Sequence, residues 1–360
     1  MKKWKAGIVG LSRGGGFARV LEAHPRMETV ALCDIAPETL AKTGAAFKLS
    51  DRQLFTDFES FLNAPTEVVI IATPIAHHAR QTIAALEGGK QVLCEQTAAY
   101  ALEDCERIVA AVKRTGRMYM MAENYCYFHY VREWKKLIEQ GKLGELFYAE
   151  GEYVHEIIGL LVEEKTGGFY WRHERPPIWY CAHCLGPLLT LMDDRIVAAC
   201  GSHAGFHKLP QHREHIGFLD MEVGLFRTRK GALIKILRSQ VAHRYPHLVW
   251  YSLYGTKGYV EGGRDMKDGL LYIEGETARK EGAQRIPCPI SDPNAPEEAR
   301  RGGHGTSEFY MIRDFLDALD AGARPPIDVM RSMDFTVPGI VAHESAMSDG
   351  NWREVPLFDW

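Results

Sequence analysis

The chain has 360 residues, of which 46% are hydrophobic and 25% charged, with a formal net charge of −4. This length exceeds the usual size of a single core, so we expect two domains. The charge gives no reason to expect nucleic acid or an anionic membrane as a partner. Since no apolar stretch approaches the ~20 residues that span a membrane and no signal-peptide core is present, we expect a soluble, cytoplasmic protein.

The eight cysteines are scattered through predicted core elements, which favours reduced thiols over a disulfide framework. Cys181, His183 and Cys184 resemble half of a zinc site, but no second pair follows at metal spacing. A local group of histidines is interpreted as surface residues on a loop: His203, His207, His212 and His215. We therefore expect no metal.

Residues 6–34 contain the most informative pattern of the chain. An apolar run at 6–9 leads into the glycine-rich segment 10–16, and a helical stretch and a second apolar run ending at Asp34 follow. A strand, a tight turn and a helix in this order bring backbone N–H groups toward a pyrophosphate. Asp34 would accept hydrogen bonds from an adenosine ribose and repel a 2′-phosphate, so the pattern favours NAD over NADP.

Several residues of this turn are candidate cofactor ligands: Gly10, Ser12, Arg13, Gly14 and Gly15. Ser12 stands where the dinucleotide motif has its middle glycine. The alternatives are a glycine turn in some other α/β unit and, for Arg13, a solvated loop side chain rather than a phosphate ligand.

The first half continues with alternating strands and helices. The expected strands are 67–73, 90–95 and 118–122, and the expected helices are 37–46, a short one after 55–57, 79–87 and 102–115. Alternation of this kind predicts a doubly wound parallel sheet whose ligands bind beyond the carboxyl ends of the strands. Thr73, His77, Glu95 and Glu123 all follow such ends.

From about residue 124 the pattern changes to that of an α+β domain with a largely antiparallel open sheet. A helix is expected at 131–140, strands at 145–155, 220–227, 233–241, 248–253 and 258–260, and a loop at 284–305. A helix begins near Ser307, and 327–347 is helical or mixed. We expect a Rossmann domain at 1–123 and a substrate-binding and oligomerisation domain at 124–360, whose C-terminal segment could pack back on the first.

With these elements in order, the chain resembles the Gfo/Idh/MocA family of oxidoreductases over nearly its whole length. The likeness rests on Ala72-Thr73-Pro74 with His78, on Cys94-Glu95, on Gly144-Glu145-Leu146 and on residues 324–328. It implies NAD as cofactor, a sugar or polyol substrate, a homodimer or homotetramer, and cofactor contacts at these positions: Thr73, Pro74, His78, Glu95 and Gln96.

Gln96 departs from the family pattern, in which Glu-Lys-Pro follows the fourth strand and the lysine assists proton transfer. The chain has Glu95-Gln96-Thr97 instead. An amide has no usable proton to transfer near neutral pH. An ordinary dehydrogenase mechanism therefore needs another proton-transfer residue.

Closer similarity lies with a branch that also lacks this lysine, the NAD-dependent glycoside hydrolases typified by α-N-acetylgalactosaminidases. The similar stretches are 123–127, 150–156, 171–172 and 180–187. By this resemblance Glu123, Tyr153, Tyr180 and His183 correspond to site residues of those enzymes. Cys181, Ala182 and Cys184 replace the usual neighbours, which could change substrate preference.

Tyr180 and His183 are also suited to proton transfer by their residue types and spacing. The apolar run 185–192 predicts a helix, and side chains three residues apart at its start can face one cleft. Histidine exchanges protons near neutral pH, and tyrosine can donate or accept one. The alternative is a hydrogen-bonded core pair. Further candidates, each equally compatible with a structural role, are His78, His155, Arg172, Tyr254 and His304.

These residues predict oxidation of a sugar ring carbon, C3, with Tyr180 or His183 as base. The resulting ketone acidifies the neighbouring C–H, which allows loss of the C1 substituent, addition of water and return of the hydride. Two alternatives remain: a simple NAD-dependent sugar or polyol dehydrogenase, and a non-catalytic NAD- or sugar-binding protein.

Overall fold

The computed structural model describes residues 2–360, which form two compact units. The first contains the chain up to Phe128 together with Ile290–Met333 and Phe358–Trp360. The second contains His129–Pro289 and Asp334–Leu357. The segment 290–333, expected in the second domain, thus groups with the first unit.

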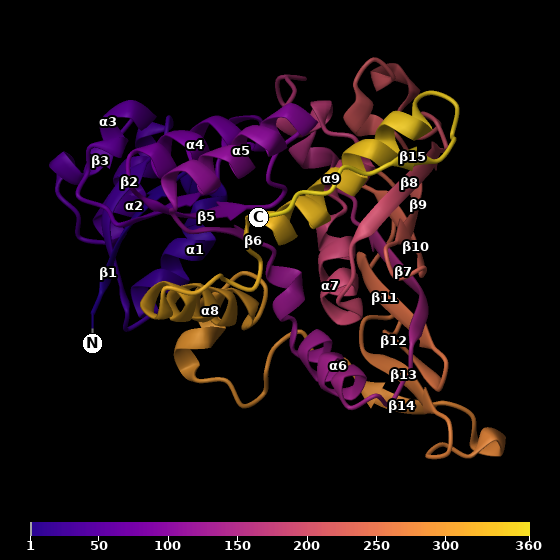
Figure 1. The fold of residues 1–360 in the computed structure, drawn as a ribbon. Helices are drawn as coiled ribbons and strands as arrows, with labels where there is room; N and C mark the ends of the chain where they lie inside the picture. The colour runs from indigo at the N-terminus through magenta and orange to yellow at the C-terminus, as the bar shows by residue number, and fades with distance from the viewer. Residues whose placement is uncertain (1) are drawn as a thin grey trace. The chain divides into compact units, whose positions relative to one another are not determined.

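The first unit is built on a six-stranded parallel sheet with the order β3-β2-β1-β4-β5-β6 (Figure 1). Its strands are β1 (Trp4–Val9), β2 (Met27–Cys33), β3 (Leu54–Phe55), β4 (Val68–Ile71), β5 (Gln91–Glu95) and β6 (Tyr119–Ala122). The chain order reverses between β1 and β4, where doubly wound sheets bind their ligands. The predicted doubly wound fold is confirmed.

Helices cover both faces of this sheet. They are α1 (Leu11–Ala23), α2 (Pro37–Ala46), α3 (Phe58–Leu62), α4 (His78–Glu87), α5 (Leu102–Thr115) and α8 (Ser307–Ala321). Helices α4 and α5 pack together on one face, while α1 and α8 contact each other on the opposite face (Figure 1). This cover explains why β4 reads as a continuous apolar run, since all four of its residues are buried.

The second unit is built on a nine-stranded sheet with the order β14-β13-β12-β11-β7-β10-β9-β8-β15. Its strands are β7 (Leu146–Val154), β8 (Ile196–His203), β9 (Glu222–Thr228), β10 (Leu233–Ser239), β11 (Leu248–Gly255), β12 (Gly258–Glu261), β13 (Asp268–Ile273), β14 (Gln284–Pro287) and β15 (Arg353–Glu354). Only β7 and β10 pair in parallel, which confirms the largely antiparallel sheet. Its helices are α6 (His129–Glu139), α7 (Ala182–Met192) and α9 (Val329–Ala346), which begins in the first unit, and α7 packs against β7 and β11.

Two sequence predictions need correction here. The loop expected over 284–305 is wrong at its start, because Gln284–Pro287 pairs with β13 as an edge strand. No residue of β14 is buried, so no apolar alternation marks it. Helix α7 begins at Ala182 rather than Leu185, which places Tyr180 in the preceding 3₁₀ turn, Pro177–Tyr180.

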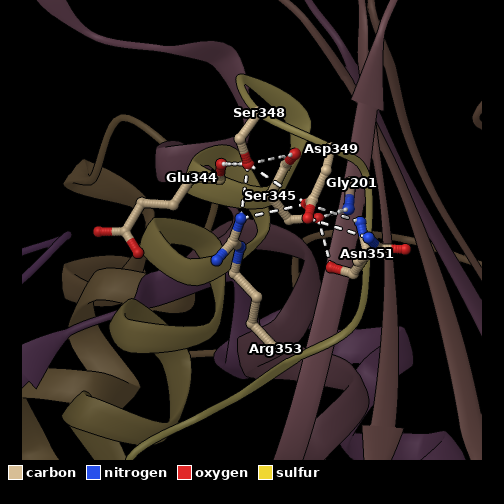
Figure 2. Close-up of polar contacts among 7 residues, drawn as sticks. All are labelled: Gly201, Glu344, Ser345, Ser348, Asp349, Asn351 and Arg353. Atoms are coloured by element: carbon tan, nitrogen blue, oxygen red, sulfur yellow. Dashed lines mark hydrogen bonds and ion pairs between the residues drawn. The ribbon is translucent and has the colours of Figure 1, made fainter.

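Contacts of Ser345 and Arg353 fix the turn between α9 and β15 (Figure 2). The hydroxyl of Ser345 accepts a hydrogen bond from Gly201 N in β8 at 3.2 Å and donates one to Asn351 O at 2.7 Å. Arg353 donates to Asp349 Oδ1 at 3.1 Å. The end of α9 is thereby held against the edge of the sheet that β15 extends.

We expect Gly201→Ala to destabilise the protein, because a Cβ at this position would lie 2.3 Å from the carbonyl oxygen of Ala342 in α9. Overpacking of this kind typically costs about 1–3 kcal/mol. Thermal unfolding should show a Tm several degrees lower. Gly159→Ala is the control, since a Cβ there meets nothing within 4 Å; equal Tm values for the two variants would contradict the prediction.

Among residues 2–360, no helix is both long and apolar enough to cross a membrane.

Candidate active site

The turn after β1 brings two backbone segments into close approach at Gly10. Its φ is +85°, and a Cβ at this position would lie 2.6 Å from Ala72 C and 2.7 Å from Thr73 N. Both the conformation and the space therefore require glycine. Gly14, one residue before the motif's last position, allows the close packing of helix on strand, because a Cβ there would lie 2.9 Å from Ile8 in β1.

Helix α1 begins directly after Gly10 and has no acidic residue in its first turn. The unpaired N–H groups of a helix start, together with the helix dipole, favour an anion. A Cβ on Gly15 would meet nothing within 4 Å, so the surface beside the turn is open. These features fit the pyrophosphate of a dinucleotide.

Asp34 lies just after β2, where a ribose ligand is expected. One carboxylate oxygen accepts a hydrogen bond from Leu11 N at 2.6 Å and the other from Ala36 N at 2.8 Å. An ionised carboxylate accepts about four hydrogen bonds. Asp34 therefore keeps capacity for the two ribose hydroxyls of NAD while it is held against the glycine turn.

Arg13 belongs to a network of charged side chains in the first unit. Its Nε lies 2.6 Å from Glu95 Oε1, at the end of β5, and its Nη2 lies 3.7 Å from Glu308. The Glu308 side chain is fully buried and contacts His304 Nδ1 at 2.8 Å. Burial alone would raise the pKa of Glu308, but His304 and Arg13 together hold it below its usual value. Arg13 is thus ion-paired rather than solvated.

His78 connects the ends of β4 and β5. Its ring nitrogens lie 2.8 Å from Thr97 O and 2.9 Å from Thr73 O, and the side chain is buried. Burial lowers the pKa of His78, although both carbonyl contacts oppose this effect. Thr73 in turn donates its hydroxyl proton to Gln81 at 2.6 Å. A role of His78 toward the cofactor remains a prediction.

Glu123 lies directly after β6 in the first unit. Its side chain is fully buried, and one oxygen accepts a hydrogen bond from Tyr125 N at 3.1 Å. Burial raises the pKa of Glu123 to about 8, against the opposing effects of Tyr125 N–H, His304 and Arg13. A carboxyl group with such a pKa can donate or accept a proton near neutral pH.

The second unit brings together the other three predicted catalytic residues. The ring centroid of Tyr180 lies 5.0 Å from that of His183, with the rings perpendicular, and Tyr153 lies 5.4 Å from His183. Tyr153 and Tyr180 stack with centroids 6.5 Å apart. Three different elements supply them: β7, the 3₁₀ turn at 177–180 and α7.

His155 extends this cluster. Its Nδ1 lies 2.8 Å from the Tyr153 hydroxyl, and its ring lies 4.5 Å from that of His247. Burial, followed by the charges of His247, Arg238 and His183, lowers the pKa of His155 to about 4. His155 is therefore neutral at physiological pH and forms a hydrogen bond with the phenol.

The remaining candidates have ordinary structural contacts. Arg172 stacks on Trp171 at 4.4 Å, and Tyr254 stacks on Tyr259 at 5.5 Å. All eight cysteines are buried free thiols, Cys181 and Cys184 included. Across residues 2–360 no group of three or more His, Cys, Asp or Glu side chains could hold a metal ion.

Sequence reasoning missed two residues of the second unit. Arg175 and Arg238 lie against the faces of Tyr180 and Tyr153, at 3.9 Å and 4.1 Å from the ring centroids. Neither belongs to a recognisable motif. For Arg238 the available signal was its place in the predicted strand 233–241, on the same face as Ile234 and Ile236, which indicates a buried arginine.

Comparisons with known proteins agree with this geometry. Residues 4–123 match the model of the oxidoreductase family with an NAD-binding Rossmann fold. A glycosyl hydrolase family 109 protein of Solibacter usitatus is 26% identical, over 98% of this chain and 88% of its own. An alpha-N-acetylgalactosaminidase of Shewanella oneidensis is 27% identical, over 81% of this chain and 69% of its own.

A solved structure of levoglucosan dehydrogenase in complex with NADH has the same fold, with a TM-score of 0.82 and 19% identity over 99% of this chain and 100% of that one. The likeness to this NADH-bound structure is one of fold, and it covers almost the whole chain. The match of residues 4–123 to the NAD-binding oxidoreductase family model confirms the predicted resemblance to the Gfo/Idh/MocA family. The cofactor prediction, NAD, is confirmed with it.

We expect Asp34→Asn to relax discrimination against NADP, because the variant loses the negative charge that repels a 2′-phosphate. The ratio of the Kd for NADP to that for NAD should fall about tenfold or more, measured by calorimetric titration. The exposed Glu38, in the first turn of α2, provides the control variant Glu38→Gln. An unchanged ratio in Asp34→Asn would remove the assigned role.

We expect Glu123→Gln to change how stability depends on pH. A folded-state pKa of about 8, above the ordinary value of 4.5, means that the stability contributed by the protonated carboxyl is complete below about pH 4.5 and lost as pH rises through about 8. The Tm of the wild type should therefore fall relative to that of the variant between pH 5 and 8. Glu106→Gln, at an exposed position of α5, should track the wild type.

Proposed function

We propose that this chain is an NAD-dependent enzyme that oxidises a ring carbon of a sugar and thereby cleaves a glycoside. The observation that carries the proposal is the cluster of Tyr153, Tyr180 and His183, whose rings contact one another in the second unit. The names of the relatives, glycosyl hydrolase family 109 protein and alpha-N-acetylgalactosaminidase, support the substrate class.

Bound NAD supplies an acceptor for hydride that can later return it. The task of the protein is to move protons. Tyr180 or His183 takes the proton of the C3 hydroxyl as the C3 hydride leaves, which produces a ketone. The ketone acidifies the C2 hydrogen, and a second base of the cluster removes it as the C1 substituent departs. Water then adds at C1, a proton returns to C2, and reduction at C3 restores the alcohol, so that the net reaction is hydrolysis.

Gln96 supports the assignment of proton transfer to the tyrosines and His183. It stands where the general Gfo/Idh/MocA pattern has the proton-transferring lysine, and its amide cannot replace that function. Glu123 is a further titratable group, because burial raises its pKa to about 8. The second unit contributes Tyr153, with His155 hydrogen-bonded to its hydroxyl.

Levoglucosan dehydrogenase shares the fold, so a simple sugar dehydrogenase is the second candidate. Product analysis separates the two. A redox glycosidase releases the C1 substituent of a chromogenic glycoside without net accumulation of NADH, whereas a dehydrogenase accumulates NADH with an alcohol substrate. Mass spectrometry of the purified protein should first show retained NAD.

We expect Tyr180→Phe and His183→Ala each to lower turnover at least about 100-fold, the typical loss when a proton-transfer group is removed. Steady-state kinetics with the glycoside that the wild type cleaves provides the measurement. The matched control is Tyr254→Phe, because Tyr254 packs on Tyr259 and Tyr148 away from this cluster. Near-normal rates in both site variants, with unchanged Tm, would remove these assignments.

A further inference from the structure

Two fully buried arginines lie against the faces of the clustered tyrosines. The guanidinium carbon of Arg238 lies 4.1 Å from the ring centroid of Tyr153 and 5.1 Å from that of Tyr180. The guanidinium carbon of Arg175 lies 3.9 Å from the Tyr180 centroid. Both arginines are 1% exposed, so a ligand that approaches from solution cannot contact them.

Within residues 2–360 neither arginine has a carboxylate partner within ion-pair distance. Arg238 Nη1 donates to the carbonyl oxygens of Tyr153 at 3.0 Å and Ser239 at 2.9 Å. Arg175 Nη2 donates to the side-chain oxygen of Gln240 at 2.6 Å. The Nε atoms of both arginines are buried without a hydrogen-bond partner.

The sheet itself places an acidic residue beside Arg238, yet the two do not pair. In the strand register Arg238 stands beside Tyr153 of β7 on one side and Glu222 of β9 on the other. The carboxylate of Glu222 is engaged elsewhere: one oxygen contacts His343 Nδ1 at 2.6 Å and the other accepts from Ile178 N at 2.8 Å. The positive charge next to the tyrosines is therefore left without a close counter-ion.

A buried cation without a counter-ion is costly, and arginine does not escape the cost by losing its proton near neutral pH. Burial does lower the pKa of Arg238 from its usual value, while Tyr153 and Tyr180 act in the opposite direction. The electron-rich ring faces compensate part of the charge. A phenolate on either tyrosine would compensate it with a full negative charge.

We propose that Arg238 and Arg175 are positioning residues that hold Tyr153 and Tyr180 by their ring faces and stabilise negative charge on the phenol oxygen during proton transfer. This inference rests on the proposed function and makes a tyrosine the base. The phenolate takes the proton of the sugar hydroxyl and becomes a neutral phenol. The ring carbon that carries this hydroxyl loses its hydride to NAD.

The neighbouring titratable groups agree with a tyrosine as base. His155 and His183 face Tyr153, and His183 also faces Tyr180. Burial, the charge of His247 and the charge of Arg238 act together to lower the pKa of His155 to about 4. The same arginine charge thus opposes a protonated imidazole and favours an ionised phenol.

Spectrophotometric titration of the protein without substrate tests the proposal directly. The chain has 15 tyrosines, so the phenolate absorbance of Tyr153 must be separated from that of the others. It is obtained by subtracting the absorbance of the Tyr153→Phe variant from that of the otherwise identical protein. In Arg238→Met this component should move up by about one to two pH units, and Arg238→Lys, which keeps the charge, should restore most of the shift. Arg227→Met removes a guanidinium from the face of Trp352, 4.4 Å away in the same unit, and should change nothing.

An unmoved tyrosine component in a folded Arg238→Met protein would overturn the proposal, as would an equal shift in Arg227→Met. If Arg238→Met does not fold, Arg175→Met with Tyr180→Phe as the subtracted variant gives the same test at the second tyrosine. A shift there supports the proposal, and its absence overturns it.

Kinetics add a readout that a purely structural role would not move. In Arg238→Met, kcat at pH 7 should fall at least tenfold with KM changed less than about threefold, and part of the loss should be recovered at higher pH. A wild-type protein that contains NAD and acts on no sugar or glycoside would refute the proposed function. The titration would still decide whether the arginines stabilise the phenolate.

Discussion

The close backbone approach at Gly10 is the constraint on which the first unit depends. Because Gly10 adopts φ +85° against the Ala72–Thr73 backbone, the chain turns directly from β1 into α1. This turn places the start of the helix at the point where the strand order of the sheet reverses. Asp34 accepts a hydrogen bond from Leu11 N in the same turn, so one piece of backbone holds both the predicted ribose ligand and the predicted pyrophosphate-binding turn.

The two units handle buried charge in opposite ways. In the first unit Arg13 and His304 accompany the buried carboxylates Glu95 and Glu308, so positive and negative groups largely compensate each other. In the second unit Arg175 and Arg238 are buried against tyrosine rings without a carboxylate. Uncompensated charge is costly in the interior, and such sites commonly perturb proton affinities for function. The contrast points to the tyrosine cluster as the place where a negative charge develops.

Much of the fold could be predicted because its signals are local. The glycine turn with Asp34 and the apolar run of β4 follow directly from residue type and spacing. Tyr180 and His183 could be paired because they lie three residues apart. The edge strand β14 could not be predicted, since none of its residues is buried and only its pairing with β13 defines it.

The sequence by itself determined the doubly wound coenzyme domain, NAD as the cofactor and the candidates for proton transfer, because each depends on neighbours within a short stretch of chain. Only the tertiary structure decided that Tyr153 joins the Tyr180–His183 pair and that Arg175 and Arg238 lie behind the rings. It also decided that the carboxylate of Glu222 contacts His343 rather than Arg238. These contacts join residues far apart in the chain, and the charge balance of a buried site depends on all groups that surround it in space.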